Sequence, residues 1–409
     1  MGRLLFLGAS ASQVAAIRFA RASGHWLAAV DGDADAVGRS LVDAFEVIDF
    51  TDVERVTKVA RRYRVDGVLA VASDRAVLPA ARVAESLGLP GIGSSVALRM
   101  TDKAVMRSCL EAAGVRQPRF AVAERTQLHF KGSVRLPAVV KPVDSGGQRG
   151  LFRVSDRKEL ERRLPESLAF SISGRAIVET YIEGSELNGM VVVRDGEPTL
   201  LTLSDRLRPQ GRGFGVGWAH SYPSALSPAA LADATELAYR AVAALGLRNG
   251  IAFPQLLVDE QGTVWLVEIA ARIAAGQMAD LVRFAAGVNL YEVAVTLALG
   301  QPVPDHLIHS SNRRPIAIRF LTAAPGVLPV GVVDQIAGLD AVRSSPGVLA
   351  AELYFEVGHE IKPVQVDADR SGYVIATGPT AAAALDRADQ AAKKLVIHTA
   401  ESQPDRARR

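Results

Sequence analysis

Lys141 stands at the end of a short apolar run, directly before a loop that contains Gly146, Gly147 and Gly150. Glycines in such a loop leave backbone N–H groups open toward an anion, and the lysine adds a cation at the same place. The spacing is not that of a P-loop, which requires G-x-x-x-x-G-K-[ST]. This stretch therefore predicts either a lid that closes over nucleotide phosphates or an ordinary hairpin with a solvated lysine.

Gln255 and Glu268 lie on two apolar runs joined by a turn, as in a β-hairpin. We expect Val258 to pair with Thr263 beside the turn. That register makes Gln255 and Glu268 diagonal neighbours on one face, close enough to share a cation. A glutamate among apolar residues must be paired or metal-bound if it is buried. A magnesium site and a structural Glu268–Arg272 ion pair both satisfy this requirement.

Composition limits the class of protein. A chain of 409 residues is expected to form two or three domains, and its content of 49% apolar and 22% charged residues is that of a globular protein. We expect no membrane span, no signal peptide and, with a net charge of +3, no nucleic-acid partner. The single cysteine, Cys109, excludes an internal disulfide and a cysteine-based metal cluster. Cytoplasmic location is the default, and residues 401–409 are expected to form a disordered tail.

The first hundred residues alternate between strand and helix patterns. Strands are expected at 3–8, 26–30, 45–48 and 67–72, and helices at 13–23, 53–63 and 75–87. This alternation predicts a doubly wound α/β unit with a parallel sheet. Gly8 after the first strand and Asp31 after the second are placed as in a dinucleotide site, but two of the three fingerprint glycines are missing.

The remaining elements follow in order. A helix is expected from Lys103 to Gly114, with Thr101 or Asp102 as its N-cap. Further helices are expected at 156–168, 228–245 and 380–396, and strands at 138–140, 175–182, 187–193, 251–258, 263–269, 316–321, 349–355 and 372–376. Residues 204–222 show no periodicity and predict a functional loop.

Five motifs in this order resemble the ATP-grasp superfamily and, within it, the L-amino acid ligase type of carboxylate–amine ligase. They are Asp102-Lys103, Val140-Lys-Pro with its glycine loop, Val178-Glu-Thr-Tyr-Ile-Glu-Gly-Ser-Glu186, Glu268-Ile-Ala-Ala-Arg272 and Gly358-His-Glu-Ile-Lys-Pro363. The resemblance implies an α/β (α+β) chain with an ATP-grasp fold. It divides the chain into a Rossmann-like pre-ATP-grasp domain (1–95), an ATP-grasp domain (96–308, lid about 118–177) and a C-terminal α/β domain (309–400).

The resemblance also implies roles for individual residues. The ATP phosphates would be held by Lys103, Lys141 and the loop with Ser145, Gly146 and Gly147, and adenosine would be bound by Glu179, the backbone at Tyr181 and Ile182, and Glu186. The metal ion, Mg²⁺ or alternatively Mn²⁺, would be held by Glu268 and Gln255. The substrate would be contacted by Arg272, Gln277 and His220. Arg272 and Lys141 would be the catalytic residues. Such an enzyme joins small-molecule carboxylate and amine substrates through an acyl phosphate, and a homodimer is the default assembly.

The chain departs from the family pattern at several positions. The first metal position, normally glutamate, is Gln255, and the asparagine expected two residues after the second glutamate is Ala270. Gln148 stands where serine is common, and 274–276 replaces paired glycines. A glutamine carbonyl can ligate a metal but brings no charge, so we expect weakened magnesium binding. A nucleotide-binding homologue with altered or lost turnover, acting as a partner protein, is therefore the alternative to a ligase.

Overall fold

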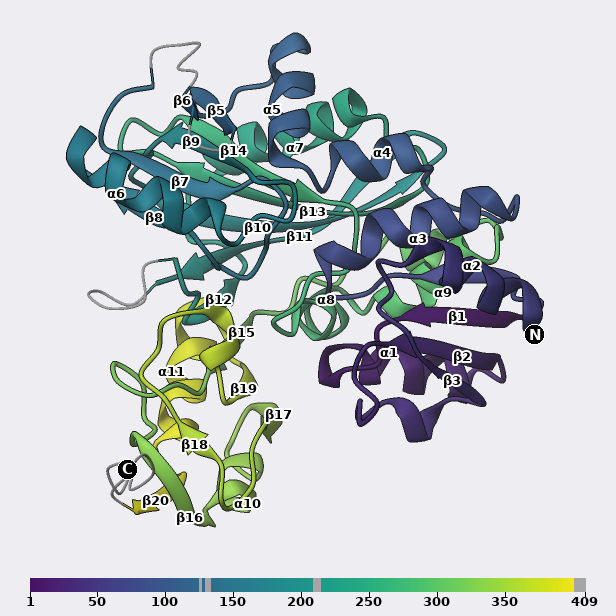
Figure 1. The fold of residues 1–409 in the computed structure, drawn as a ribbon. Coiled ribbons are helices and arrows are strands. Elements are labelled where there is room, and N and C mark those ends of the chain that lie inside the picture. The colour runs from purple at the N-terminus through teal and green to yellow at the C-terminus, as the bar shows by residue number, and fades with distance from the viewer. Residues whose placement is uncertain (125–126, 129–133, 209–214, 401–409) are drawn as a thin grey trace, which may run out of the picture. The chain divides into compact units, whose positions relative to one another are not determined.

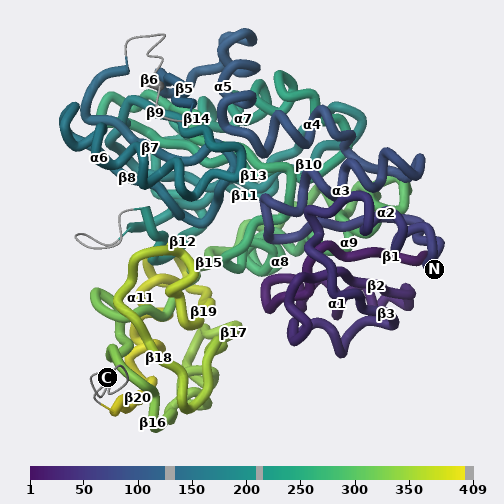
Figure 2. The backbone as a smooth tube through the Cα atoms, in the orientation of Figure 1, coloured from purple at the N-terminus to yellow at the C-terminus, as the bar shows by residue number. Residues whose placement is uncertain are grey.

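The computed structural model describes residues 1–124, 127–128, 134–208 and 215–400. The chain forms two compact units (Figures 1 and 2). The first comprises Met1–Gly146, Gly150–Leu203 and Leu226–Asn312, and the second Gly147–Arg149, Ser204–Ala225 and Arg313–Arg409. The tail expected at 401–409 lies outside the described residues.

The N-terminal part of the first unit is the predicted parallel α/β sheet. Its strands β1 (Arg3–Leu7), β2 (Trp26–Asp31), β3 (Ala44–Val47) and β4 (Gly67–Leu69) lie in the order β3-β2-β1-β4, and α1 (Ala11–Ala22), α2 (Val53–Arg62) and α3 (Asp74–Ser86) alternate with them. All three strand pairs are parallel. The apolar side of this sheet packs against α2 and α3, because residues such as Val56, Val59 and Val83 belong to the same core as Leu5 and Val30.

The turn after β1 is held by hydrogen bonds of two polar side chains. The side chain of Gln13 lies over Gly8, where an added Cβ would come within 3.3 Å of it, and its Nε2 donates to the Val71 carbonyl. The Asp31 carboxylate accepts a hydrogen bond from the Ala9 backbone. Gln13 and Asp31 therefore have hydrogen-bond partners within the protein.

A five-stranded antiparallel sheet, β6-β5-β9-β7-β8, carries the glycine loop. Its strands are β5 (Phe120–Glu124), β6 (Gln127–Leu128), β7 (Ala138–Pro142), β8 (Phe152–Val154) and β9 (Arg175–Thr180), and α6 (Arg157–Leu168) packs on β7 and β8 (Figure 1). The predicted hairpin is confirmed, since β7 pairs with β8 from Ala138↔Val154 to Val140↔Phe152. Lys141 therefore projects from the strand end next to the loop.

The second sheet of this unit contains β14-β13-β10-β11. It is formed by β10 (Ser185–Arg194), β13 (Gly250–Val258), β14 (Val264–Ala270) and β11 (Glu197–Leu207), of which residues 204–207 belong to the second unit. Helices α5 (Lys103–Ala112) and α7 (Pro228–Leu245) pack in its apolar core. The caps predicted for α5 are confirmed, because Asp102 accepts from the Ala104 and Val105 backbones and Gly114 has a φ of 64°.

The register predicted for the β13–β14 hairpin is wrong. Val258 pairs with Val264, and Gln255 lies directly opposite Glu268, while Leu256 pairs with Leu266. The one residue left over on β14 is Val267, so the ladder contains a β-bulge at this point. The bulge brings Glu268 from a diagonal position to a directly opposed one.

Three helices of the first unit had no sequence prediction: α4 (Ser94–Arg99), α8 (Met278–Ala286) and α9 (Leu290–Ala298). Across the described residues, no single helix has the length and hydropathy of a membrane span. Helices α8 and α9, bent by 110° relative to each other, reach those values only when they are counted together.

The second unit contains two sheets. In the first, the strands lie side by side in the order β12 (Ala219–Tyr222), β15 (Ile316–Phe320), β19 (Gly372–Thr377) and β17 (Val348–Leu353). Helix α11 (Ala381–Ala392) packs on β15 and β19, and α10 (Leu339–Arg343) contacts β17. The second is a three-stranded sheet in the order β18 (Glu360–Ile361), β16 (Gly331–Ala337) and β20 (Val396–Ala400). The aperiodic segment predicted at 204–222 is wrong at both ends, because β11 continues to Leu207 and β12 begins at Ala219. The residues between them fall partly outside the described chain.

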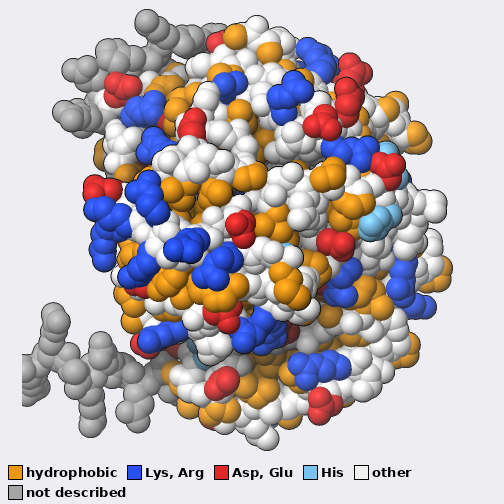
Figure 3. All heavy atoms as spheres, turned by 90° about the vertical axis from the view of Figure 1, so that its right-hand side faces the viewer, with side chains coloured by type: hydrophobic (Ala, Val, Ile, Leu, Met, Phe, Trp, Pro, Cys, Tyr) orange, Lys and Arg blue, Asp and Glu red, His pale blue; other side chains and the backbone are white. Residues whose placement is uncertain are grey.

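Charged side chains of both signs are interspersed on the face shown in Figure 3. Arginines cover several aromatic rings of the N-terminal part, as Arg3 does over Trp26 at 3.7 Å and Arg62 over Tyr63 at 4.7 Å. These two arginines thus have aromatic partners next to them.

Candidate functional site

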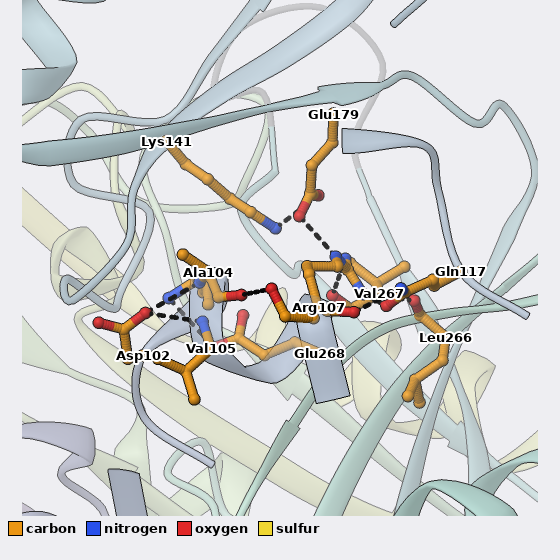
Figure 4. A network of polar contacts seen from close by, with 12 residues as sticks. Asp102, Ala104, Val105, Arg107, Gln117, Lys141, Glu179, Leu266, Val267 and Glu268 are labelled. Carbon is orange, nitrogen blue, oxygen red and sulfur yellow. Dashed lines mark hydrogen bonds and ion pairs between the residues drawn. The ribbon is translucent and has the colours of Figure 1, made fainter. Parts of the chain in front are cut away.

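Three charged side chains meet in the interior of the first unit (Figure 4). Arg107 of α5 contacts Glu179 Oε1 through its Nε at 2.8 Å, and Lys141 of β7 contacts Glu179 Oε2 through its Nζ at 2.9 Å. All three residues are at most 5% exposed. Both carboxylate oxygens of Glu179 are therefore ion-paired, one to each cation.

The charges around Glu179 and around Lys141 shift the pKa values of these two groups for different reasons. Burial acts to raise the pKa of Glu179, but Arg107 and Lys141 outweigh it and lower that pKa to about 2. Burial lowers the pKa of Lys141. The attraction of Glu179 acts to raise that pKa, but the nearby charges of Arg107 and Lys103 oppose it. Lys141 thus shares its counterion, and a second anion beside it would stabilise the ammonium.

Arg107 also fixes the bulge of β14. Its guanidinium donates to the carbonyls of Leu266 and Val267, at 3.1 and 2.6 Å, and to Gln117 Oε1 at 3.2 Å. Consecutive carbonyls of a regular strand point to opposite sides, whereas here one guanidinium reaches two of them. The bulge makes this possible, and Arg107 connects the strand that carries Glu179 with the strand that carries Glu268.

Lys103 and Glu268 form the next part of the site. Lys103 Nζ lies 3.3 Å from Glu268 Oε1 and donates to the carbonyl of Ser145, in the glycine loop, at 2.8 Å. Burial acts to lower the pKa of Lys103, but Glu268 and Asp74 outweigh it and raise the pKa. The structure therefore brings Lys103, Glu268 and the start of the glycine loop together.

Arg272 has a different partner from the one considered in the sequence. Its Nε and one terminal nitrogen contact the two carboxylate oxygens of Asp74 at 2.6 and 2.8 Å, a bidentate pair. Asp74 begins α3 of the parallel α/β part, and Glu268 pairs with Lys103 instead. The suggested Glu268–Arg272 ion pair is therefore wrong. An added Cβ on Gly146 would lie 2.8 Å from Asp74 Oδ2, so the loop backbone approaches this pair closely.

The residues present fit a magnesium ion that shares its coordination with phosphates. Glu268 would supply one carboxylate, and Gln255, directly opposite it in the ladder, would supply an amide carbonyl. Among the described residues, no group of three or more His, Cys, Asp and Glu side chains could hold a metal by itself. Magnesium is commonly held by one or two carboxylates together with substrate phosphates and water, which matches this donor set.

The other predicted residues are spread more widely. The Tyr181 backbone N–H donates to the Pro137 carbonyl at 3.0 Å, and Arg153 lies 4.4 Å from its ring. Ile182 is half-buried directly after β9, Glu186 is half-buried near the start of β10, and Gln277 caps α8 in a left-handed conformation. Gly147 and His220 belong to the second unit.

Sequence reasoning missed Arg107 and Asp74. Arg107 follows Lys103 by four residues, so the two share one face of α5, and this spacing in a buried helix was an available signal. Asp74 follows the last strand of the parallel sheet at its carboxyl end, where ligands of such sheets bind. Its pairing with a residue 198 positions away carries no local signal.

Comparisons with known proteins agree with this geometry. Three family models match successive parts of the chain: the ATP-grasp N-terminal domain at 16–91, the D-ala D-ala ligase C-terminus at 109–273 and the L-amino acid ligase C-terminal domain 2 at 319–400. Successive parts of the chain are therefore similar to ATP-grasp proteins. The homologues it matches include ATP-dependent ligases.

Individual relatives support the same assignment. The D-alanine--D-alanine ligase of Gloeobacter violaceus is 31% identical over 201 residues, which cover 45% of this chain and 63% of that ligase. The structure of the L-amino acid ligase from Bacillus licheniformis matches with a TM-score of 0.84 and 20% identity, covering 98% of this chain and 99% of that one. The biotin carboxylase domain of Hydrogenobacter thermophilus 2-oxoglutarate carboxylase, solved with MgADP, matches with a TM-score of 0.76 at 18% identity, covering 97% and 90%.

Proposed function

We propose that this protein is an ATP-dependent ligase that joins the carboxylate of an amino acid to an amine through an acyl phosphate. The observation that carries the proposal is the convergence of Lys103 and Lys141, from separate elements, around Glu179 and Glu268 in one unit. A triphosphate and a carboxylate repel each other, so cations must offset their charge before a phosphoryl group can move between them. The two lysines and Arg272 supply that charge.

The reaction then follows two steps. A carboxylate oxygen attacks the γ-phosphorus of ATP, which forms the acyl phosphate and releases ADP. The amine nitrogen attacks the acyl carbon, the C–O bond to phosphate breaks, and the nitrogen loses a proton to give the amide. Lys103, Lys141 and the loop with Ser145, Gly146 and Gly147 would hold the phosphates, and Arg272 would stabilise the acyl phosphate. Glu179, Tyr181, Ile182 and Glu186 would surround the nucleoside.

Glu268 and Gln255 would hold the metal ion. Magnesium, when bound, neutralises charge on the phosphate oxygens. Lys103 contacts Glu268, so it would orient the carboxylate between the metal position and the glycine loop.

The pair formed by Asp74 and Arg272 supports an amino acid as the substrate. A zwitterion carries an ammonium and a carboxylate, and this pair offers one group of each opposite charge at contact distance. Substrate would exchange the internal ion pair for two external ones, with Asp74 taking the ammonium and Arg272 the carboxylate or acyl phosphate. Gln277 and His220 remain proposed substrate contacts.

A nucleotide-binding protein with lost turnover is the second candidate. It is favoured by one observation: Gln255, rather than an acid, lies opposite Glu268, so the metal position has a single carboxylate. In that case ADP and ATP would bind without phosphate release from any pair of substrates.

The two candidates are separated by measuring phosphate release with ATP, Mg²⁺ and a panel of amino acids paired with amines. We expect release that depends on both substrates and falls about a hundredfold or more in Lys141→Met. The matched control is Lys58→Met, since Lys58 is 68% exposed on α2 and should leave the rate unchanged. Nucleotide binding without release from any pair would favour the second candidate, and no nucleotide binding at all would refute both.

A further inference from the structure

The connection between α6 and β9 holds the start of the glycine loop through Asp144, a residue that the proposed chemistry does not use. The Asp144 carboxylate accepts hydrogen bonds from Ser171 Oγ at 2.8 Å and from the backbone N–H groups of Ile172 and Ser173 at 3.2 and 2.7 Å. Both carboxylate oxygens take part, since Ser171 and Ile172 donate to Oδ1 and Ser173 donates to Oδ2. All four residues belong to the first unit.

These contacts stabilise the ionised carboxylate. Burial acts to raise the pKa of Asp144, but the hydrogen bonds from Ser173, Ser171 and Ile172 outweigh it and lower that pKa. The donors are uncharged, and several N–H and O–H donors on one carboxylate are sufficient for such a shift. Asp144 is therefore charged at neutral pH and binds this connection by charge-assisted hydrogen bonds.

The partners of Asp144 are distant in sequence, which distinguishes it from an aspartate that only stabilises a turn or a helix end. Asp156 accepts from the backbone of Glu159, three residues further on, and caps α6. Asp144 accepts from residues that lie 27 to 29 positions away. Asp144 thus joins two separate segments of the chain, whereas Asp156 stabilises one.

The start of the glycine loop also contacts the N-terminus of α5. Lys103 donates through its backbone N–H to the Val143 carbonyl at 2.9 Å and through Nζ to the Ser145 carbonyl at 2.8 Å. The Val143 N–H donates to the Arg175 carbonyl at 3.2 Å, and the Arg175 guanidinium pairs with Asp102, the N-cap of α5. The start of the loop is therefore bonded both to α5 and to the chain that leads into β9.

The far end of the glycine loop lies against the same connection. An added Cβ on Gly150, which has a φ of 71°, would lie 2.9 Å from Phe170 Cδ2 and 3.0 Å from Pro142 Cγ. Glycine is the residue that suits both this backbone conformation and this close packing. The segment 170–173 thus contacts both ends of the loop, through Asp144 at one end and through Gly150 at the other.

The direction of the Lys103 ammonium depends on this arrangement. Among the described residues, Lys103 Nζ contacts the Ser145 carbonyl at 2.8 Å and Glu268 Oε1 at 3.3 Å. An ammonium has three N–H donors, so these two contacts fix the direction of the third. Without the Ser145 carbonyl, the ammonium would turn toward Glu268.

We propose that Asp144 is a positioning residue, which fixes the start of the glycine loop on the segment 170–173 and thereby orients Lys103 toward the nucleotide phosphates. Asp144 acts indirectly, through the carbonyl of Ser145 next to it in the chain. The proposal rests on the proposed function in one respect, the contact between Lys103 and phosphate.

The anchoring is tested on the full-length, nucleotide-free protein by hydrogen exchange and mass spectrometry. The amides of Val143 and Lys103 form hydrogen bonds at the start of the loop, so they report its local opening. Both should exchange about tenfold faster in Asp144→Ala, because hydrogen bonds to a charged group are lost. Asp156→Ala is the matched control, since it removes a side-chain to backbone bond at α6 and should leave both amides unchanged. Equal exchange in the parent and in Asp144→Ala would overturn the proposal.

The orientation of Lys103 is tested by ADP affinity, measured by calorimetry. Asp144→Ala should weaken ADP binding about tenfold, and Asp156→Ala should not change it. Lys103→Met should also weaken it, and the double variant Asp144→Ala/Lys103→Met should bind ADP as Lys103→Met does, because a residue that acts through Lys103 has no effect once the lysine is gone. Additive losses would overturn the proposal, since a merely structural contribution of Asp144 would persist without the lysine.

Ser171→Ala replaces Asp144→Ala if that variant does not fold. It removes one of the three hydrogen bonds to Asp144, so it should speed exchange of the same amides and weaken ADP binding by about threefold. No change in either measurement for a folded Ser171→Ala would then overturn the proposal.

The outcomes for the two proposals are distinguishable. A parent protein that binds no ADP would refute the proposed ligase function and, with it, the orientation of Lys103 toward phosphates. Normal ADP binding that Asp144→Ala does not change would refute the positioning role alone and leave the ligase function standing.

Discussion

Replacing Glu179 with glutamine tests whether the buried charges of the first unit are arranged as described. The substitution keeps the size of the side chain but removes the charge that Arg107 and Lys141 share. Both cations would then be buried without a counterion on β9. We expect Glu179→Gln to lower the stability of the first unit and to do so in a pH-dependent way.

The magnitude follows from the pKa of the carboxyl group. It falls from 4.5 to about 2 in the folded protein, and each unit corresponds to about 1.4 kcal/mol, so the ionised form contributes on the order of 3 kcal/mol. Because the folded pKa is the lower one, this contribution is fully present above pH 4.5 and is lost progressively as the pH falls through about 2. The same size, about 3–5 kcal/mol, is typical for removing one partner of a buried ion pair.

The assay is urea unfolding between pH 7 and pH 3, followed by tryptophan fluorescence. In a Trp218→Phe background the signal comes from Trp26 and Trp265, both in the first unit. The difference between the parent and Glu179→Gln should be about 3 kcal/mol at pH 7 and should shrink toward pH 3. Glu161→Gln, which breaks an exposed ion pair with Arg157 on α6, should change stability by less than about 0.5 kcal/mol. A difference independent of pH would refute the assignment of the low pKa to Glu179.

Two further predictions concern the metal and substrate positions. Gln255→Glu places a second carboxylate opposite Glu268, so magnesium affinity in the presence of ADP, measured by calorimetry, should rise about tenfold; no gain would count against Gln255 as a ligand. Asp74→Asn removes the carboxylate that pairs with Arg272, so the KM for the amino acid should rise about tenfold or more while ADP affinity changes little. A parallel loss of ADP affinity would show that the Asp74–Arg272 pair supports nucleotide binding instead.

Local patterns were sufficient for much of the fold. The alternation of strands and helices in the parallel sheet, the N-cap at Asp102 and the hairpin whose first strand carries Lys141 all depend on residues close in sequence, and all are confirmed. Helices α8 and α9 were missed because each has only nine residues, fewer than the 11 to 18 over which a helical period is recognised.

The site was only partly predictable, for a physical reason. Lys141 and Glu268 were recognisable because each is a charged residue at or within an apolar run, whereas Lys103 was identified only through the family resemblance. The pairing of Arg272 with Asp74 depends on tertiary packing between distant segments, and nothing in either segment specifies it. The bulge at Val267 is likewise invisible in the sequence, because the apolar run from Val264 to Val267 fits a regular strand as well as a bulged one.

Arg107 has a consequence for how related sequences can diverge. Its guanidinium pairs with Glu179 and also donates hydrogen bonds to the carbonyls of Leu266 and Val267 at the bulge of β14. A homologue that replaces Arg107 must lose the acid at position 179 and shorten β14 by one residue, or supply another donor for both. We therefore expect three features to covary across an alignment: the identity of position 107, the identity of position 179 and the length of the strand before Glu268.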